Sequence, residues 1–157
     1  MKARWILMLA FVMAAGWGNA ALAAGADVVV RTAKGEFKEV KERLLHAIEN
    51  RGLVLNYTAR IGAMLERTGK DIGAARKVYA DAELLEFCSA RVSRETMEAD
   101  PRNIVYCPYG IAVYTLPKEP GRVYVAYRRQ AAATGASAKP LAAVDKLLAE
   151  IIAEALK

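Results

Sequence analysis

The chain has 157 residues, of which 25% are charged, and a formal net charge of +6 at neutral pH. Its basic residues are spread among acidic ones along the sequence, so the composition argues against a nucleic-acid-binding protein. Its length suits one domain, and the motifs of serine hydrolases, phosphate-binding glycine loops and H-E-x-x-H metalloproteases are absent from the sequence.

The first 23 residues have the pattern of a cleavable export leader. Two basic residues among the first four precede a run without charge, and Ala21 and Ala23 form an A-x-A cleavage site. The most apolar part, residues 5–15, is about half the ~20 residues that cross a bilayer, so a retained anchor is the weaker interpretation. We expect cleavage near Ala23, a periplasmic location and no stable membrane span in the mature domain over 24–157. Cleavage removes two positive charges, which lowers the net charge from +6 to +4.

The first half of the mature chain predicts two strands that flank a helix. A β-branched run predicts the first strand, and recurring apolar residues followed by a glycine predict the helix. The next run alternates and predicts a half-buried strand with Leu53, Leu55, Tyr57, Ala59 and Ile61 on one face. The predicted elements are a strand over 27–32, a helix over about 36–50 and a strand over 53–61. Residues 62–77 fit either a short helix or a structured loop.

The second half predicts three strands, a short helix between the first two, and a final helix. The short helix over 89–99 ends at Asp100-Pro101, because a residue before proline avoids helical geometry. A flexible connection over 131–139 leads to a C-terminal helix over 140–156, whose first turn suits Pro140. The predicted strands cover 79–88, 104–116 and 123–128.

The resulting order is β-α-β-β-(short helix)-β-β-α, with a core over about 27–130. In this order the strands form a mostly antiparallel sheet, and the helices cover one of its faces. The sequence therefore predicts a single α+β domain.

The sequence resembles the "domain of unknown function 302" family over nearly all of the mature chain. The run FCSARVSRETMEADPRNIVYCPYGIAVY carries the resemblance, with LERTGKDIG before it and VYVAYRR after it. The resemblance implies a compact α+β domain with a sheet like that of the TATA-box-binding protein, and it makes a homodimer a candidate assembly. It implies fold rather than activity, because the family has no established biochemical role.

Two stretches depart from the commoner, non-exported pattern of that family. Cys88-Ser89-Ala90 stands where the family tends to have Gly-Asn-Pro, and Tyr106-Cys107-Pro108 stands where it usually has Leu-Pro. Ligand chemistry that the Gly-Asn-Pro turn supports in relatives is therefore not transferred to this chain.

Cys88 and Cys107 are the two cysteines of the chain, and their first interpretation is a structural disulfide. Two cysteines in an oxidising compartment pair when their geometry allows it. If the strand ending at Cys88 is antiparallel to the strand beginning near Cys107, the two lie opposite each other, about 5 Å apart, within the reach of a disulfide. Closing a loop of about 20 residues stabilises a protein by roughly 3 kcal/mol.

Thiol chemistry, either disulfide exchange or carriage of sulfur as a persulfide, is the second interpretation. It requires a thiolate stabilised by positive charge or by a helix N-terminus. Cys88 precedes the predicted helix start at Ser89, and Arg91 and Arg94 follow in the first turns, although a C-x-x-C motif is absent from the sequence.

Metal binding is the third interpretation. Two thiolates together with Met97 suit Cu(I). A closed zinc site needs four ligands, and the single histidine, His46, falls on the polar side of its predicted helix. We expect neither a metal nor a cofactor.

Tyrosines crowd the last two predicted strands, where they are good strand formers. Clustered amphipathic rings also line small-ligand pockets and dimer surfaces, and an arginine at the strand end suits an anion. The candidate ligand or interface face consists of Tyr106, Tyr109, Tyr114, Tyr124, Tyr127 and Arg128.

We interpret the chain as an exported accessory domain that binds a small ligand or a partner and is stabilised by a Cys88–Cys107 disulfide, rather than as an enzyme. The alternative is a thiol-active protein in periplasmic redox or sulfur handling.

Overall fold

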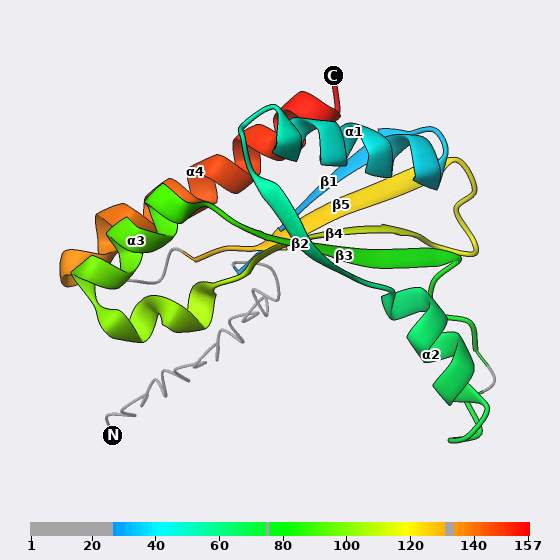
Figure 1. The fold of residues 1–157 in the computed structure, drawn as a ribbon. Helices are drawn as coiled ribbons and strands as arrows, with labels where there is room; N and C mark the ends of the chain where they lie inside the picture. The colour runs from blue at the N-terminus through cyan, green and yellow to red at the C-terminus, as the bar shows by residue number, and fades with distance from the viewer. Residues whose placement is uncertain (1–26, 75, 131–133) are drawn as a thin grey trace, which may run out of the picture.

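The computed structural model describes residues 27–74, 76–130 and 134–157. The predicted leader over 1–23 and part of the predicted connection over 131–139 lie outside these residues. The described chain forms one five-stranded antiparallel sheet in the order β1-β5-β4-β3-β2 (Figure 1). Its strands are β1 (Val28–Lys34), β2 (Val54–Ala59), β3 (Asp81–Cys88), β4 (Tyr109–Thr115) and β5 (Arg122–Arg128).

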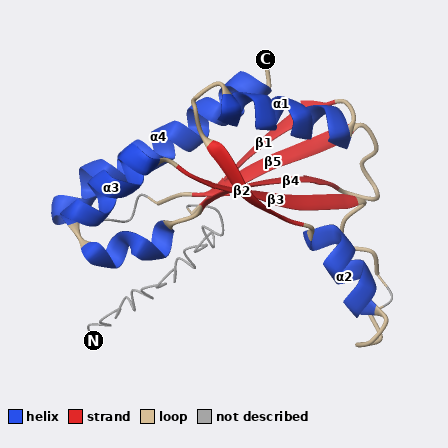
Figure 2. Ribbon diagram, viewed as in Figure 1, coloured by secondary structure: helices blue, strands red, loops and turns tan. Residues whose placement is uncertain are grey.

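The described residues also form four α-helices and two short 3-10 helices, which confirms the α+β class (Figure 2). The helices α1 and α4 lie over one face of the sheet, and α3 packs against α4 at the end of that layer (Figure 1). The α-helices are α1 (Phe37–Glu49), α2 (Ile61–Gly69), α3 (Ala90–Ala99) and α4 (Ala138–Ala155). The 3-10 helices are η1 (Pro101–Tyr106) and η2 (Gly135–Ser137).

The core lies between the sheet and the layer of α1 and α4. Apolar residues at helical spacing place one stripe of each helix against the sheet, and alternate residues of the strands meet them. Each fully buried aliphatic side chain contributes about 1.5–3 kcal/mol to stability. The fully buried set includes Val40, Leu44 and Ile48 of α1, Leu141, Val144, Leu148 and Ile151 of α4, and Leu85, Phe87, Ile111, Val113, Val123 and Val125 of the sheet.

The segment with two sequence interpretations forms α2, which stands apart from the helical layer and projects from the end of the sheet (Figure 1). It begins at Ile61, which the sequence assigned to the preceding strand. Gly62 lets the helix approach the start of β3 closely, because a Cβ at this position would lie 2.9 Å from the backbone nitrogen of Ala82. α2 has no buried residue.

A β-bulge in β2 overturns the predicted face of that strand. Leu55 pairs with Phe87, whereas Tyr57 pairs with the adjacent residue Glu86, so Asn56 is the extra residue. A bulge moves the residues beyond it to the other side of the sheet. Tyr57 therefore leaves the face that Leu55 shares with the core, and its side chain is 61% exposed.

The predicted strand over 104–116 is wrong in its first five residues. Asp100 caps η1 by accepting a hydrogen bond from the backbone N–H of Arg102, and Pro101 occupies the first turn. The Asn103 side chain then donates to the Thr96 carbonyl at 2.7 Å and to Ser137 Oγ at 2.9 Å. These buried polar contacts hold 101–106 in helical geometry, so β4 begins only at Tyr109.

The C-terminal helix begins at Ala138, two residues before its predicted start, and Pro140 lies in its first turn. Among the described residues, no helix is long and apolar enough to cross a membrane.

Candidate functional site

Cys88 and Cys107 come together at the end of the sheet where β3 leads into α3. Cys88 is the last residue of β3, and Cys107 lies between η1 and β4. The ladder between these strands ends at the pair Phe87–Tyr109, so Cys107 approaches from outside the ladder and is not directly opposite Cys88. The two residues are thiols whose Sγ atoms lie 2.6 Å apart. The two cysteines therefore lie together at one end of the sheet, as predicted, but they are not directly opposite each other in the ladder.

The surroundings of the pair favour neutral sulfur over a thiolate. Burial, followed by the hydrogen bond with Cys107, raises the pKa of the Cys88 thiol from 9.0 to about 11. Ser93 of α3 lies 3.7 Å from Cys107 Sγ and 3.1 Å from the Tyr109 hydroxyl, and all three are partly or fully buried. A thiol in such a setting is a weak nucleophile at neutral pH.

The two arginines that follow Cys88 in sequence are engaged away from it. Arg91 donates to Glu95 at 2.8 Å and Arg94 donates to Glu98 at 2.7 Å, both as i,i+4 pairs on the exposed side of α3. The start of α3 is itself capped, since Ser89 Oγ accepts from the backbone N–H of Val92 at 3.4 Å. The two arginines that could have stabilised a Cys88 thiolate therefore point into solvent.

The metal interpretation rests on Cys88, Cys107 and Met97, which lies in α3. Over the described ranges, no three or more histidine, cysteine, aspartate or glutamate side chains lie close enough to hold an ion. His46 is exposed on α1.

The structure divides the candidate tyrosine face between both sides of the sheet. Tyr109 and Tyr127 lie in the core, 1% and 7% exposed, so the expectation of one common face does not hold for them. Tyr114 and Tyr124 lie on the opposite side and stack with ring centroids 5.0 Å apart. Successive residues of a strand alternate between faces, so the odd spacings of 109 to 114 and 124 to 127 already carried this signal.

The side of the sheet opposite α1 and α4, called here the open face, contains a groove of about 400 Å³. Gly110, Ala112 and Ala126 are the small residues of its central strands, and the register pairs Ala112 with Ala126 and Gly110 with Glu86. Arg128 follows Ala126 by two residues, so Glu86, Gly110 and Arg128 succeed one another across three strands. Leu84, Tyr106, Pro108 and Val28 complete much of the lining.

Gln130 adds a polar group to the groove. It is 7% exposed and lines the groove beside Arg128. Its side-chain Nε2 donates to the Arg128 carbonyl at 2.7 Å, while its Oε1 is buried without a hydrogen-bond partner among the described residues. A buried acceptor without a partner is costly. The sequence interpretation missed Gln130 and the small residues. Gly110 and Ala112 at alternate positions of one strand were a visible signal that small side chains leave space on that face of the sheet.

Two comparisons fit this architecture. The family model described as "Domain of unknown function DUF302" matches residues 28–157. The chain therefore belongs to the DUF302 family, as the resemblance in its sequence indicated. A search of curated proteins gave no match.

A crystal structure of an uncharacterised conserved DUF302 protein from Bacillus stearothermophilus is similar to this chain, with a TM-score of 0.69 at 14% sequence identity. The likeness covers 85% of this chain and 100% of that one. At this identity the likeness supports the fold alone.

Proposed function

We propose that this DUF302 domain is an exported accessory module that binds a small ligand or a partner on the open face and is stabilised by a disulfide between Cys88 and Cys107. The observation that carries the disulfide is the 2.6 Å separation of the two Sγ atoms. A disulfide requires about 2.05 Å, so bond formation needs a shift of only about half an ångström. The leader pattern supports export to an oxidising compartment, where such a pair is oxidised.

The proposed disulfide has a structural purpose. It ties the end of β3 to the start of β4, and the loop that it closes contains α3 and η1. Loop closure of this length restricts the unfolded chain. The raised pKa of Cys88 argues against the alternative, a thiol-active protein in redox or sulfur handling, because such activity depends on a thiolate.

The test is intact-mass analysis with thiol counting on protein exported to a periplasm, followed by redox titration against glutathione. We expect a mass two protons lighter than that of the dithiol, no free thiol and a potential below about −300 mV. A bound metal, an added sulfur atom, or a bridge that glutathione reduces readily would overturn the structural disulfide. The same mass measurement reports whether the chain begins at Ala24.

The binding proposal is supported by the groove on the open face. Its small floor residues and its Arg128 suit a compact molecule with an apolar body and an anionic group. The test is a thermal-shift screen of small carboxylates and phosphates with the wild type, Arg128→Ala and, as a matched control on the same face, Arg122→Ala. We expect a hit whose stabilisation is lost in Arg128→Ala and kept in Arg122→Ala.

A second copy of the chain is the competing occupant of the open face. Light scattering on the same samples measures the molar mass. A stable dimer that Arg128→Ala or Tyr57→Ser dissociates, together with an empty ligand screen, would assign the open face to self-association instead.

A further inference from the structure

α2 and the loop after it form a projecting arm, defined here as residues 60–74 and 76–78. The arm leaves the sheet at the start of β3, on the side away from α1 and α4 (Figure 1). The cysteine pair lies at the other end of β3, and an eight-residue strand is roughly 25 Å long. The arm is therefore remote from the site described above.

The apolar side chains of the arm have little cover. Met64 and Leu65 on α2 are 38% and 36% exposed, and Ile72 and Val78 in the loop are 79% and 43% exposed. A hollow of about 350 Å³ lies between the helix and the loop, and Leu65, Ile72 and Val78 line it. An amphipathic helix normally buries its apolar stripe against the core. Because α2 has no buried residue, its apolar side is available to something outside the domain.

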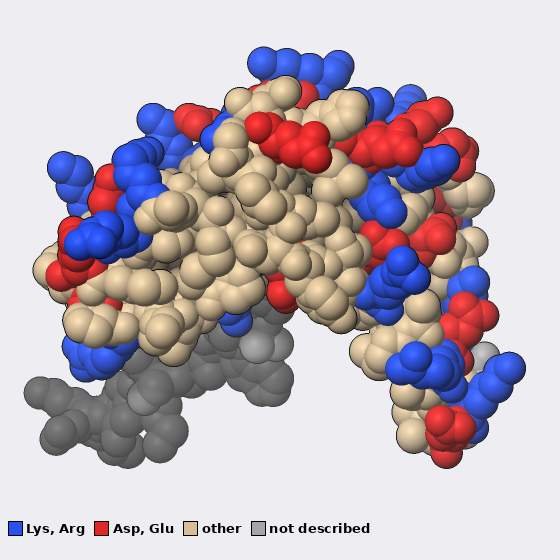
Figure 3. All heavy atoms as spheres, viewed as in Figure 1, with Lys and Arg blue, Asp and Glu red and all other residues tan. Residues whose placement is uncertain are grey.

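The arm also holds most of the net positive charge. Its five basic and two acidic residues give a net charge of +3, whereas the rest of the described chain, with sixteen basic and fifteen acidic residues, has +1. The five are exposed and lie along the arm (Figure 3). They are Arg60, Arg67, Lys70, Arg76 and Lys77. All eight ion pairs between described residues lie outside the arm.

We propose that the arm binds the surface of an anionic lipid bilayer. Exposed apolar side chains interleaved with unpaired lysine and arginine are the combination that interfacial binding uses, since the apolar groups enter the boundary of the acyl region and the cations meet the headgroups. A protein partner would need an apolar surface shaped to match Ile72, Met64 and Val78, whereas the bilayer interface covers exposed apolar side chains in any arrangement. The lipid surface accounts for both features.

The experiment is co-sedimentation of the chain beginning at Ala24 with vesicles of phosphatidylglycerol and phosphatidylcholine, or of phosphatidylcholine alone. That chain contains every described element, because they run from Val28 to Ala155. We expect binding to the anionic vesicles that weakens with salt. Each basic residue near an anionic surface contributes roughly fivefold, so Lys70→Glu/Lys77→Glu should lower the partition coefficient by at least about 25-fold.

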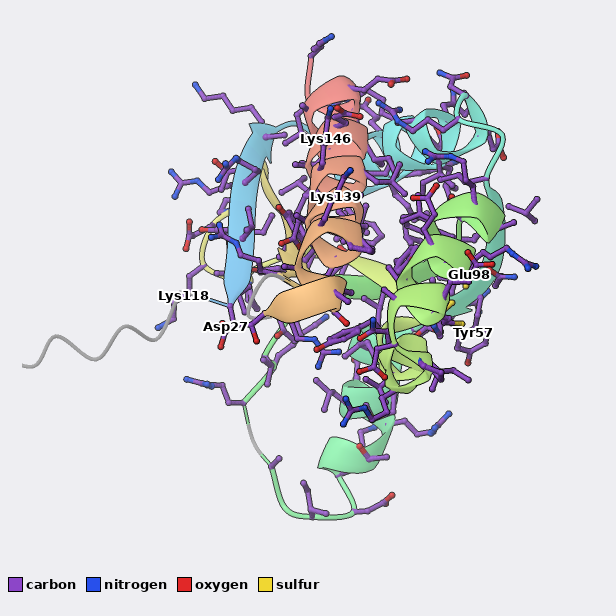
Figure 4. The ribbon with its side chains drawn as sticks, turned by 90° about the vertical axis from the view of Figure 1, so that its left-hand side faces the viewer. Asp27, Tyr57, Glu98, Lys118, Lys139 and Lys146 are labelled. Carbon is purple, nitrogen blue, oxygen red and sulfur yellow. The ribbon has the colours of Figure 1, made fainter. Side chains whose placement is uncertain are left out.

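Two further variants test whether the position of the basic residues matters beyond the net charge of the protein, and whether the apolar side chains of the arm contribute to binding. Lys139→Glu/Lys146→Glu makes the same charge change on α4, away from the arm (Figure 4), and should bind within a few-fold of the wild type. Ile72→Ser leaves the charge unchanged and should bind about tenfold more weakly, because an exposed isoleucine no longer enters the interface. Thermal melting of all variants monitors folding.

Three outcomes would overturn the proposal: equal binding to neutral vesicles, equal losses in the arm and α4 variants, or unchanged binding of Ile72→Ser. Capture by an acidic protein without vesicle binding would assign the arm to a protein partner. Serine variants of the two cysteines should bind vesicles like the wild type, so failure of this proposal and failure of the proposed disulfide are distinguishable.

Discussion

At the scale of single residues, the chemistry of this domain centres on buried polar atoms at the end of β3. Four side chains form a chain of contacts there: the Cys88 sulfur contacts the Cys107 sulfur, Ser93 contacts Cys107, and Ser93 also contacts the hydroxyl of Tyr109. Burial raises the pKa of the Tyr109 hydroxyl as well as that of the Cys88 thiol. The cluster is therefore stable in its neutral form.

A pH dependence follows for the reduced protein. The Cys88 thiol has a pKa of 9.0 when exposed and about 11 in the fold, so between pH 9 and pH 11 the unfolded chain has lost a proton that the folded chain retains. Unfolding then releases a proton, and the free energy of unfolding falls as pH rises through this window. Urea titrations of reduced and oxidised protein from pH 8 to pH 11 test this. The reduced form should lose more stability than the oxidised form, in which the thiol is absent.

The prediction would be contradicted if the free energy of unfolding fell equally with pH in the reduced and the oxidised protein. An equal decline would mean that the tyrosines cause the loss of stability. The pKa values of Tyr109, Tyr114 and Tyr127 are also raised in the folded protein, and these hydroxyls are present in both the reduced and the oxidised form.

At the scale of elements, the packing of α2 depends on one glycine. A Cβ at Gly62 would lie 2.9 Å from the backbone nitrogen of Ala82, which cannot move without disturbing β3. Gly62→Val should therefore push α2 from the sheet and cost about 1–3 kcal/mol. Hydrogen exchange of residues 61–69 should accelerate, while exchange in α1 and α4 stays slow.

Gly69→Ala is the matched control for this substitution. Its added Cβ would meet Ala74 at 3.7 Å, an ordinary contact, and alanine is the better helix former. It should leave stability unchanged or slightly raised. If Gly62→Val exchanged as slowly as Gly69→Ala, the close approach of α2 to β3 would not be what holds the arm in place.

Much at this scale was predictable. Strong apolar periodicity located α1 and α4 to within about two residues, because their stripes are long and meet a continuous core. The 3-10 helix over 101–106 was not predictable from periodicity, because it depends on side-chain contacts of Asn103, one of them with Ser137, 34 residues away in sequence. The candidate site was predictable in its cysteines and in Tyr106, Tyr127 and Arg128, which line the groove. The groove itself was not predictable, because it arises from three strands whose register is a long-range property.

At the scale of the whole molecule, the proposed disulfide contributes to the free energy of unfolding. Cys88→Ser/Cys107→Ser should unfold with a free energy about 3 kcal/mol lower than that of the oxidised wild type, because the loop entropy of the unfolded chain is restored. Urea denaturation measures the difference. Dithiothreitol should bring the wild type close to the double variant and leave the double variant unchanged. Equal stability of the oxidised wild type and the double variant would remove the structural role of the bridge.

The sequence by itself determined the α+β class, the order of most elements and the approach of the two cysteines, because these depend on local periodicity and on one strand pairing. The family was indicated by the resemblance of its residue runs to the DUF302 pattern. Only the tertiary structure decided which face Tyr57, Tyr109 and Tyr127 occupy, where Arg91 and Arg94 point, and that the basic segment around α2 projects from the sheet as an arm. These features depend on strand register and on which face of each helix packs against the rest of the fold, and local periodicity does not specify either.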